Sequence, residues 1–191
     1  MMLSLKDVIN NFLKYVNAQN IELYNEFSLQ HELGIFIREK YPNYKVQFER
    51  NVTYFFPGEN NTTKHEIDIV IFKPDLSEKY AIELKFPRNG QYPEQMYAFI
   101  KDIVFMEEVK TLGFNATCTL TVVDNKNFYT GKFTSDNIYR FFRESEKYSI
   151  NGRITKPTGD TSSFVDVKGN YDIKWENFKN FKNLKYYFLE I

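Results

Sequence analysis

The chain of 191 residues carries 25 basic and 25 acidic residues, and 18% of its residues are aromatic. This length predicts one domain over residues 1–191, with a hydrophobic core large enough to be stable without disulfides or a structural metal. Cys118 is the only cysteine, which excludes an intramolecular disulfide and a zinc site built from several cysteines. No apolar stretch is long enough for a membrane span and the first residues lack a signal-peptide pattern, so we expect a cytoplasmic protein with no membrane partner.

Two helices are predicted at the start of the chain. Apolar residues recur at helical spacing over residues 4–17, which predicts a helix that packs on the core or contributes to a homodimer. A second helix is predicted from Ser28, as its cap, to about Lys40. Glu32 lies at the edge of its apolar face, so this carboxylate either turns towards the sheet or reaches solvent.

Two predicted strands then carry acids among apolar residues. Residues 65–71 and 79–86 alternate with period two, so that their acids share one face and their isoleucines and leucine share the other. The polar, proline-containing segment between them predicts a reversal of direction and antiparallel neighbours. Asp68, Glu83 and Lys85 are therefore expected to lie side by side.

Two carboxylates beside one lysine are suited to metal-assisted hydrolysis. Mg²⁺ binds oxygen ligands and usually retains several waters, so one or two carboxylates and a substrate phosphate complete its coordination. The metal polarises a phosphoryl oxygen and lowers the pKa of a bound water, and a nearby ammonium offsets the charge that develops during attack.

A third helix and a further strand follow. Pro93 suits the first turn of a helix that runs to about Leu112, where Gly113 ends it. Gln95 lies one turn into this helix, where it is either an exposed polar residue or a contact to a ligand. Residues 115–123 then alternate as a strand that buries the single cysteine.

The segment 125–191 is predicted to be an α/β extension. We expect a short helix over residues 138–144, a hairpin over residues 161–175 that turns at Gly169, and a final strand over residues 186–191.

Charge is distributed unequally between two parts of the chain. Residues 1–125 hold 13 basic and 17 acidic residues, whereas residues 126–191 hold 12 basic and 8 acidic residues. The basic part is where phosphate contacts are expected, and its mixture of lysines and aromatic residues either stacks on a single strand of nucleic acid or belongs to the core.

The acidic motif resembles that of a known family. Asp68, followed after fourteen residues by Glu83-Leu84-Lys85, is similar to the motif of the PD-(D/E)XK nuclease superfamily, with Ile67 in place of the proline of the motif. The resemblance covers about residues 22–124. It implies an α/β (α+β) fold with a restriction-endonuclease-like core, a mixed sheet flanked by helices in the order α-β-β-β-α-β.

The resemblance also implies roles for particular residues. Asp68 and Glu83 would bind Mg²⁺, for which Mn²⁺ can substitute, together with the backbone carbonyl of Leu84. Lys85 would be the catalytic lysine. The sites that the family uses on its two helices correspond to Glu32, which would tune the site, and to Gln95, which would contact the metal-bound water or a phosphate.

The function expected from this resemblance is hydrolysis of phosphodiester bonds in nucleic acid, preferably DNA, by a metal-activated water. One alternative is a binding or regulatory module that keeps the fold without cutting. Another is an unrelated domain in which Lys85 bridges Glu83 and Asp68 as a structural ion-pair network. The two histidines, His31 and His65, adjoin acids in sequence and therefore point away from them, so we do not expect a histidine-bound metal.

Overall fold

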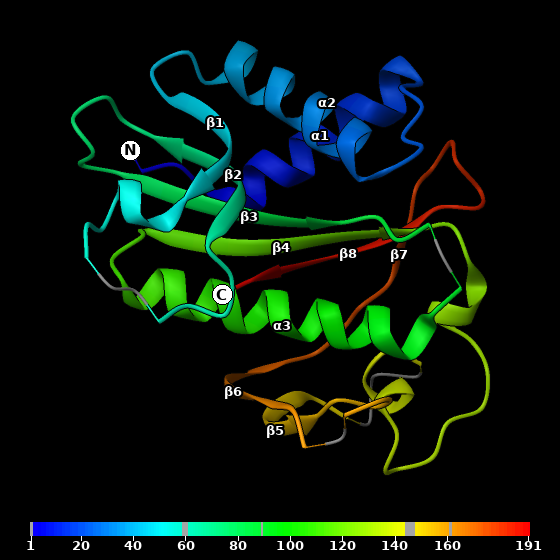
Figure 1. The fold of residues 1–191 in the computed structure, drawn as a ribbon. Helices are drawn as coiled ribbons and strands as arrows, with labels where there is room; N and C mark the ends of the chain where they lie inside the picture. The colour runs from blue at the N-terminus through cyan, green and yellow to red at the C-terminus, as the bar shows by residue number, and fades with distance from the viewer. Residues whose placement is uncertain (1, 59–60, 89, 144–147, 161) are drawn as a thin grey trace.

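A six-stranded mixed sheet lies at the centre of the molecule, and helices cover both of its faces (Figure 1). The computed structural model describes residues 2–58, 61–88, 90–143, 148–160 and 162–191. In spatial order the strands are β1 (Lys45–Asn51), β2 (Glu66–Phe72), β3 (Lys79–Lys85), β4 (Ala116–Val123), β8 (Lys185–Glu190) and β7 (Glu176–Asn177).

The helices are divided between the two faces of this sheet. Helices α1 (Leu5–Gln19) and α2 (Glu26–Lys40) cover one face, and α3 (Tyr92–Thr111) covers the other (Figure 1). A separate two-stranded sheet, β5 (Ile150–Thr155) and β6 (Phe164–Tyr171), packs on the side of α3 that faces away from the main sheet. The prediction of a mixed α/β protein with a mixed, helix-flanked sheet is confirmed.

Strand directions follow from the connections. Strands β1, β2 and β3 pair antiparallel, and the predicted reversal between β2 and β3 is closed by a hydrogen bond of 3.0 Å from Lys73 N to Glu78 O. Strand β4 pairs parallel with β3, which requires a crossover, and α3 supplies it. The order α2, β1, β2, β3, α3, β4 matches the predicted order of elements.

The period-two pattern of β2 and β3 separates two layers of core. Side chains on the α1 and α2 side include those expected to share a face: Ile69, Ile71, Ile82, Leu84 and Phe86. Ile67 departs from this pattern and packs with the layer around α3. The opposite positions of both strands therefore face α3, which is the face that carries the ionisable residues.

The N-cap of helix α2 lies three residues before the expected one. Asn25 is the N-cap, and its side chain accepts a hydrogen bond of 2.8 Å from Ser28 N. The Ser28 hydroxyl accepts in return from Asn25 N at 3.1 Å, so the two residues form a capping box. The prediction that Ser28 is the cap was wrong, and the correction places Glu26 in the first turn of the helix.

The expected hairpin turn at Gly169 was also wrong, because β6 continues through that residue. The cause lies in α3, where the buried carboxylate of Glu107 accepts hydrogen bonds from Lys168 N at 3.0 Å and Gly169 N at 2.6 Å. The Tyr171 hydroxyl donates to the same carboxylate at 3.0 Å. These tertiary contacts override the local preference of the glycine for a turn.

Two further predictions concern the C-terminal part of the chain, and the structure corrects the first and confirms the second. The helix expected over residues 138–144 is a short 3₁₀ turn, Ile138–Phe141, and residue 144 lies outside the described part of the chain. The final strand is present as β8, and it joins the main sheet beside β4.

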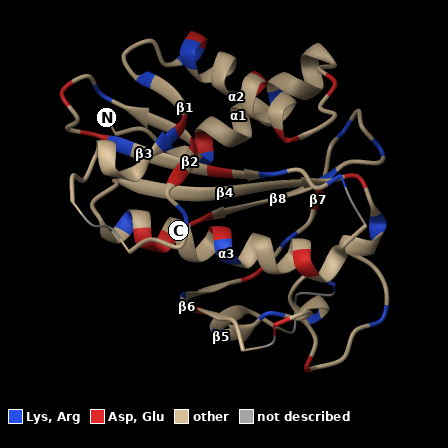
Figure 2. Cartoon of the chain, viewed as in Figure 1, with Lys and Arg blue, Asp and Glu red and all other residues tan. Residues whose placement is uncertain are grey.

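Charged residues of both signs are interspersed over the helices, strands and loops (Figure 2). Within the described ranges, no helix combines the length and the apolar character required to cross a membrane.

Candidate active site

The predicted acids lie where β2 and β3 separate. The ladder between these strands ends at the pair Ile69 and Ile82, although both strands continue past it. At the next position, side chains replace the backbone pairing. Glu83 Oε1 accepts a hydrogen bond of 3.3 Å from Asp68 N, and Asp68 Oδ2 accepts one of 2.7 Å from Leu84 N. The two carboxylates are thus held together at a fork in the sheet.

Both carboxylates are removed from water. Asp68 is 8% exposed and Glu83 is 1% exposed. Burial raises the pKa of Asp68 to about 6, although Lys64 and Lys85 act in the opposite direction. Burial also raises the pKa of Glu83 well above its ordinary value, and the neighbouring carboxylates raise it further. Positive charge close to these two groups is therefore favoured, since it would offset the cost of burying them as anions.

A third buried acid comes from the helix that covers this face. Asp102 of α3 is 3% exposed, and its Oδ1 lies 3.2 Å from Lys64 Nζ. Its Oδ2 lies 3.7 Å from Lys85 Nζ and makes no hydrogen bond with the described residues. Three buried carboxylates and two lysines therefore share one site.

Lys85 is held at the end of β3 by two neighbours. Its ammonium donates a hydrogen bond of 3.1 Å to the Leu84 carbonyl and lies 3.4 Å from Glu26 Oε1. Glu26 Oε2 also accepts from Phe86 N at 2.9 Å, which joins the start of α2 to the end of β3. Burial would lower the pKa of Lys85, but Asp102 and then Glu26 outweigh it and raise the pKa, so the ammonium keeps its charge.

The structure places the two predicted helical residues differently. Glu32 is half-buried and lies six residues after Glu26, which puts it on another face of α2. It makes no hydrogen bond or ion pair with any residue of the described part of the chain. Gln95 lies seven residues before Asp102, so the two residues share one face of α3 about two turns apart. The acid from α2 that meets Lys85 is Glu26.

A second lysine of the site belongs to a segment outside the helices and strands. Lys64 precedes β2, and its ammonium forms an ion pair with Glu83 in addition to the contact with Asp102. Burial alone would lower the pKa of Lys64, but Asp102, Glu83 and Asp68 together raise it above its ordinary value. The ion-pair alternative expected Lys85 to bridge Glu83 and Asp68, whereas Lys64 bridges Glu83 and Asp102.

Sequence reasoning missed three residues of this site, and two of them have a signal in the sequence. Asn25 and Ser28 fit a capping box, which would have placed Glu26 in the first turn of the helix. Asp102 is an acid in the middle of a largely apolar helix. Because a buried acid is rarely unpaired, this pattern predicts a charged or hydrogen-bonding partner for it. Lys64 has no such signal, because it lies outside any periodic segment.

The donor chemistry of the site fits a hard divalent cation. Carboxylate and carbonyl oxygens are the ligands that Mg²⁺ prefers, and Asp102 Oδ2 is a buried oxygen to which none of the described residues donates a hydrogen bond. As the side chains stand, no group of three His, Cys, Asp or Glu residues within the described ranges is arranged to hold a metal ion. The Lys64 ammonium lies between two of the acids instead. His31, His65 and Glu66 are exposed.

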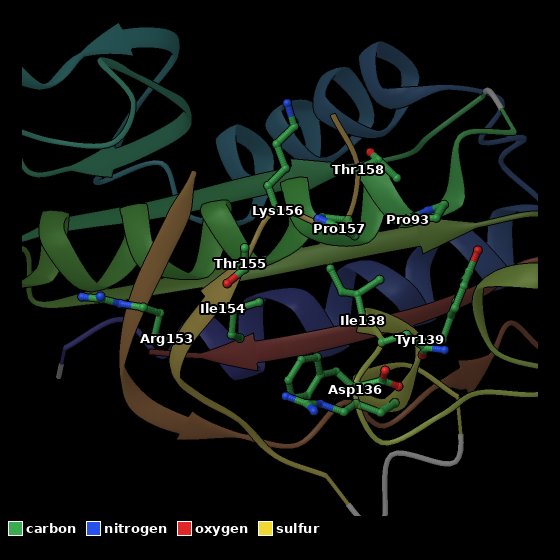
Figure 3. A pocket seen from close by; sticks show the side chains of 13 residues that line it. Pro93, Asp136, Ile138, Tyr139, Arg153, Ile154, Thr155, Lys156, Pro157 and Thr158 are labelled. Carbon is green, nitrogen blue, oxygen red and sulfur yellow. The ribbon is translucent and has the colours of Figure 1, made fainter. Parts of the chain in front are cut away.

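A separate hollow lies in the C-terminal part of the molecule (Figure 3). It has a volume of about 430 Å³, and Arg140, Arg153 and Lys156 line it together with Asp136. None of the acids or lysines of the fork lines it. Most aromatic residues of this part pack in or against the core, among them Trp175, which donates a hydrogen bond of 2.9 Å to the Phe142 carbonyl, but Phe164 is 46% exposed.

The chain was compared with known proteins in three ways. No protein-family model matches it, and neither curated proteins nor solved structures gave a match.

Proposed function

We propose that this protein is a metal-dependent nuclease of the PD-(D/E)XK type that hydrolyses phosphodiester bonds in nucleic acid, with DNA as the preferred substrate. The observation that carries the proposal is the fork between β2 and β3, where Asp68, Glu83 and Lys85 lie on one face. These are the residues that the sequence motif singled out. Their pattern in the sequence and their positions in space are separate observations, because residues spaced like a motif can lie far apart in a fold.

The topology supports a restriction-endonuclease-like core as the finer description of the fold. Three antiparallel strands are followed by a helix and a strand parallel to the third, and a helix precedes the first strand. The six-stranded sheet exceeds this core by β7 and β8, which come from the C-terminal extension.

A cation, Mg²⁺ or Mn²⁺, would be held by Asp68 and Glu83, with Asp102 and the Leu84 carbonyl as further oxygen donors. When bound, it would supply Lewis-acid chemistry, activating the attacking water and offsetting charge on the phosphate. Backbone amides orient one oxygen of each of the two acids. Leu84 N fixes one carboxylate oxygen of Asp68, and Asp68 N fixes one of Glu83.

Lys85 would act on the substrate directly. Its charge is maintained by Asp102 and Glu26, and its ammonium lies at the end of β3 beside the Leu84 carbonyl. From this place it would orient the attacking water or offset negative charge that develops on the phosphate. Glu26 would position Lys85, and Gln95 would add a polar contact from the same side as Asp102.

The second candidate function is a binding or regulatory module with the same fold and no cleavage. The contact of Lys64 with Glu83 favours it, since a buried ion pair satisfies the acid without a metal. Both functions are compatible with a cytoplasmic protein. In both, the partner would be a nucleic acid or a second copy of the chain.

Cleavage assays distinguish these two functions. Labelled single-stranded DNA, duplex DNA and RNA would be incubated with Mg²⁺ or Mn²⁺ and the wild-type protein, Glu83→Gln or Lys85→Met. Lys79→Met is the matched control, because Lys79 lies at the other end of the same strand. We expect cleavage by the wild type and the control and a loss of about 100-fold or more in both site variants. Absence of cleavage on every substrate, or cleavage that survives both site variants, would refute the nuclease proposal.

A further inference from the structure

Lys64 occupies a position that the nuclease motif does not account for. Its ammonium contacts Glu83 Oε2 and lies 3.2 Å from Asp102 Oδ1. The side chains of these two acids are 0% and 5% exposed, whereas that of Lys64 is 30% exposed. The positive charge inside the acid cluster therefore comes from a side chain that remains in contact with solvent.

The motif lysine does not fill the same position. Lys85 Nζ contacts Glu26 and lies 3.7 Å from Asp102 Oδ2, the other oxygen of that carboxylate. Strand pairing with β4 also fixes the backbone of Lys85. Lys64 alone of the two lysines is paired with Glu83, one of the two acids proposed to bind the cation.

The backbone next to Lys64 is anchored independently of its side chain. Thr63 N and Oγ1 donate hydrogen bonds of 2.6 and 2.7 Å to the carboxylate of Glu108 on α3. Thr62 Oγ1 donates to the Lys64 carbonyl at 2.6 Å. The side chain of Lys64 can therefore change its rotamer and move towards solvent while the segment that carries it stays in place.

An ammonium and a divalent cation compete for the same oxygens. Mg²⁺ requires its ligand oxygens at about 2.0–2.1 Å, so a cation bound by both Glu83 and Asp102 would need the space that the Lys64 ammonium fills between them. The two cations also repel each other strongly in a buried site.

We propose that Lys64 is an internal competitor for the cation site: its ammonium fills the place between Glu83 and Asp102, and it must leave for a divalent cation to bind. This inference rests on the metal site of the proposed function. It adds a residue whose removal strengthens cation binding, in contrast to the two acids of the motif, Asp68 and Glu83.

The first test is a calorimetric titration of Mn²⁺ into the wild type and Lys64→Met. Lys101→Met is the matched control, since it removes one lysine next to Asp102 in sequence that is exposed on α3. We expect the Kd for Mn²⁺ to fall about tenfold or more in Lys64→Met and to change less than about twofold in the control. A folded Lys64→Met protein that binds Mn²⁺ no more tightly than the wild type would overturn the proposal.

The second test uses the wild-type protein and does not depend on the folding of a variant. The rate of lysine acetylation is measured by mass spectrometry with and without saturating Mn²⁺. Displacement from the cluster should accelerate the modification of Lys64 and leave that of Lys101 unchanged. A bound cation with no effect on Lys64 would refute the competition.

The outcomes also separate this inference from the proposed function. If the wild type binds Mn²⁺ but neither test shows displacement of Lys64, only the competition fails. If neither the wild type nor Lys64→Met binds Mn²⁺, the metal site itself is absent and both proposals fail.

Discussion

At the scale of single residues, Glu26 joins two elements that meet at the site. One of its oxygens accepts a hydrogen bond from Phe86 N and the other lies near the Lys85 ammonium. If the protein cleaves nucleic acid as proposed, we expect Glu26→Gln to lower the rate of cleavage about 10- to 100-fold, because Lys85 loses a charged positioning partner while the amide oxygen can still accept from the backbone. Single-turnover cleavage measures this effect.

The control for this prediction is Glu39→Gln, which changes an exposed acid near the end of the same helix. Its cleavage rate should equal that of the wild type. The variant Glu32→Gln compares the two acids of α2 directly. A larger loss in Glu32→Gln than in Glu26→Gln would contradict the assignment of the positioning role to Glu26.

Glu78 illustrates a charged residue with a structural effect that depends on pH. It is paired with Lys73, and its Oε2 accepts hydrogen bonds from the hydroxyls of Tyr44 at 2.6 Å and Tyr80 at 2.7 Å. The hydrogen bond with Lys73, followed by those of the two tyrosines, lowers the pKa of Glu78 from its ordinary value of 4.5 to about 2. The folded protein therefore holds this carboxylate in its charged form more strongly than the unfolded chain does.

A group with a lowered pKa stabilises the fold above its unfolded pKa and loses this contribution as the pH falls through the folded value. Glu78→Gln should therefore lower the free energy of unfolding at pH 7, and its difference from the wild type should shrink between pH 4.5 and about 2. Urea denaturation at a series of pH values measures this difference. A difference that stays constant down to pH 3 would show that the charge of Glu78 is not responsible.

At the scale of elements, Glu107 joins α3 to β6. It accepts hydrogen bonds from two consecutive backbone amides of that strand and from the Tyr171 hydroxyl. We expect Glu107→Ala to lower the free energy of unfolding by about 3 kcal/mol, because these donors lose a charged acceptor in a buried place. Urea denaturation gives the change, with Lys101→Ala on the exposed side of α3 as the control. Unchanged hydrogen-exchange protection of the Lys168 and Gly169 amides in Glu107→Ala would contradict this role.

The contact between α2 and β1 depends on the absence of a side chain. A Cβ atom added to Gly34 would lie 2.2 Å from Phe48 Cζ. Alanine normally favours a helix over glycine by about 1 kcal/mol, but the overlap here should make Gly34→Ala destabilising by about 1–3 kcal/mol. Thermal unfolding of Gly34→Ala in the wild-type and Phe48→Leu backgrounds tests this cause. Gly34→Ala should destabilise the protein less once leucine replaces the Phe48 ring. An equal loss of stability in both backgrounds would exclude the ring as its cause.

These elements also show what sequence patterns can and cannot predict. The strands and the shared face of Asp68, Glu83 and Lys85 follow from period-two alternation, which is a local property of the chain. The partners Asp102 and Lys64 come from segments that local patterns do not connect to the motif. The error at Gly169 has the same origin, since a glycine that favours a turn locally is held in a strand by a carboxylate 62 residues earlier in the chain.

At the scale of the whole molecule, the acid cluster joins β2, β3 and α3, so that a cation bound there should stabilise the entire fold. At a free Mn²⁺ concentration of 100 times Kd, we expect the free energy of unfolding to rise by about 2.7 kcal/mol. Thermal unfolding of the wild type and Asp68→Asn with and without Mn²⁺ measures the effect. An equal shift of the melting temperature in both proteins would place the bound cation elsewhere.

The fork between β2 and β3 has a consequence for the extent of the sheet. Beyond Ile69 and Ile82, backbone groups that could have paired across the strands bond to the carboxylates of Asp68 and Glu83 instead. The same acids therefore serve as substitutes for missing main-chain pairing. If β2 and β3 paired along their whole length, their ladder would be longer and more regular, and these backbone amides would no longer be available to the two carboxylates.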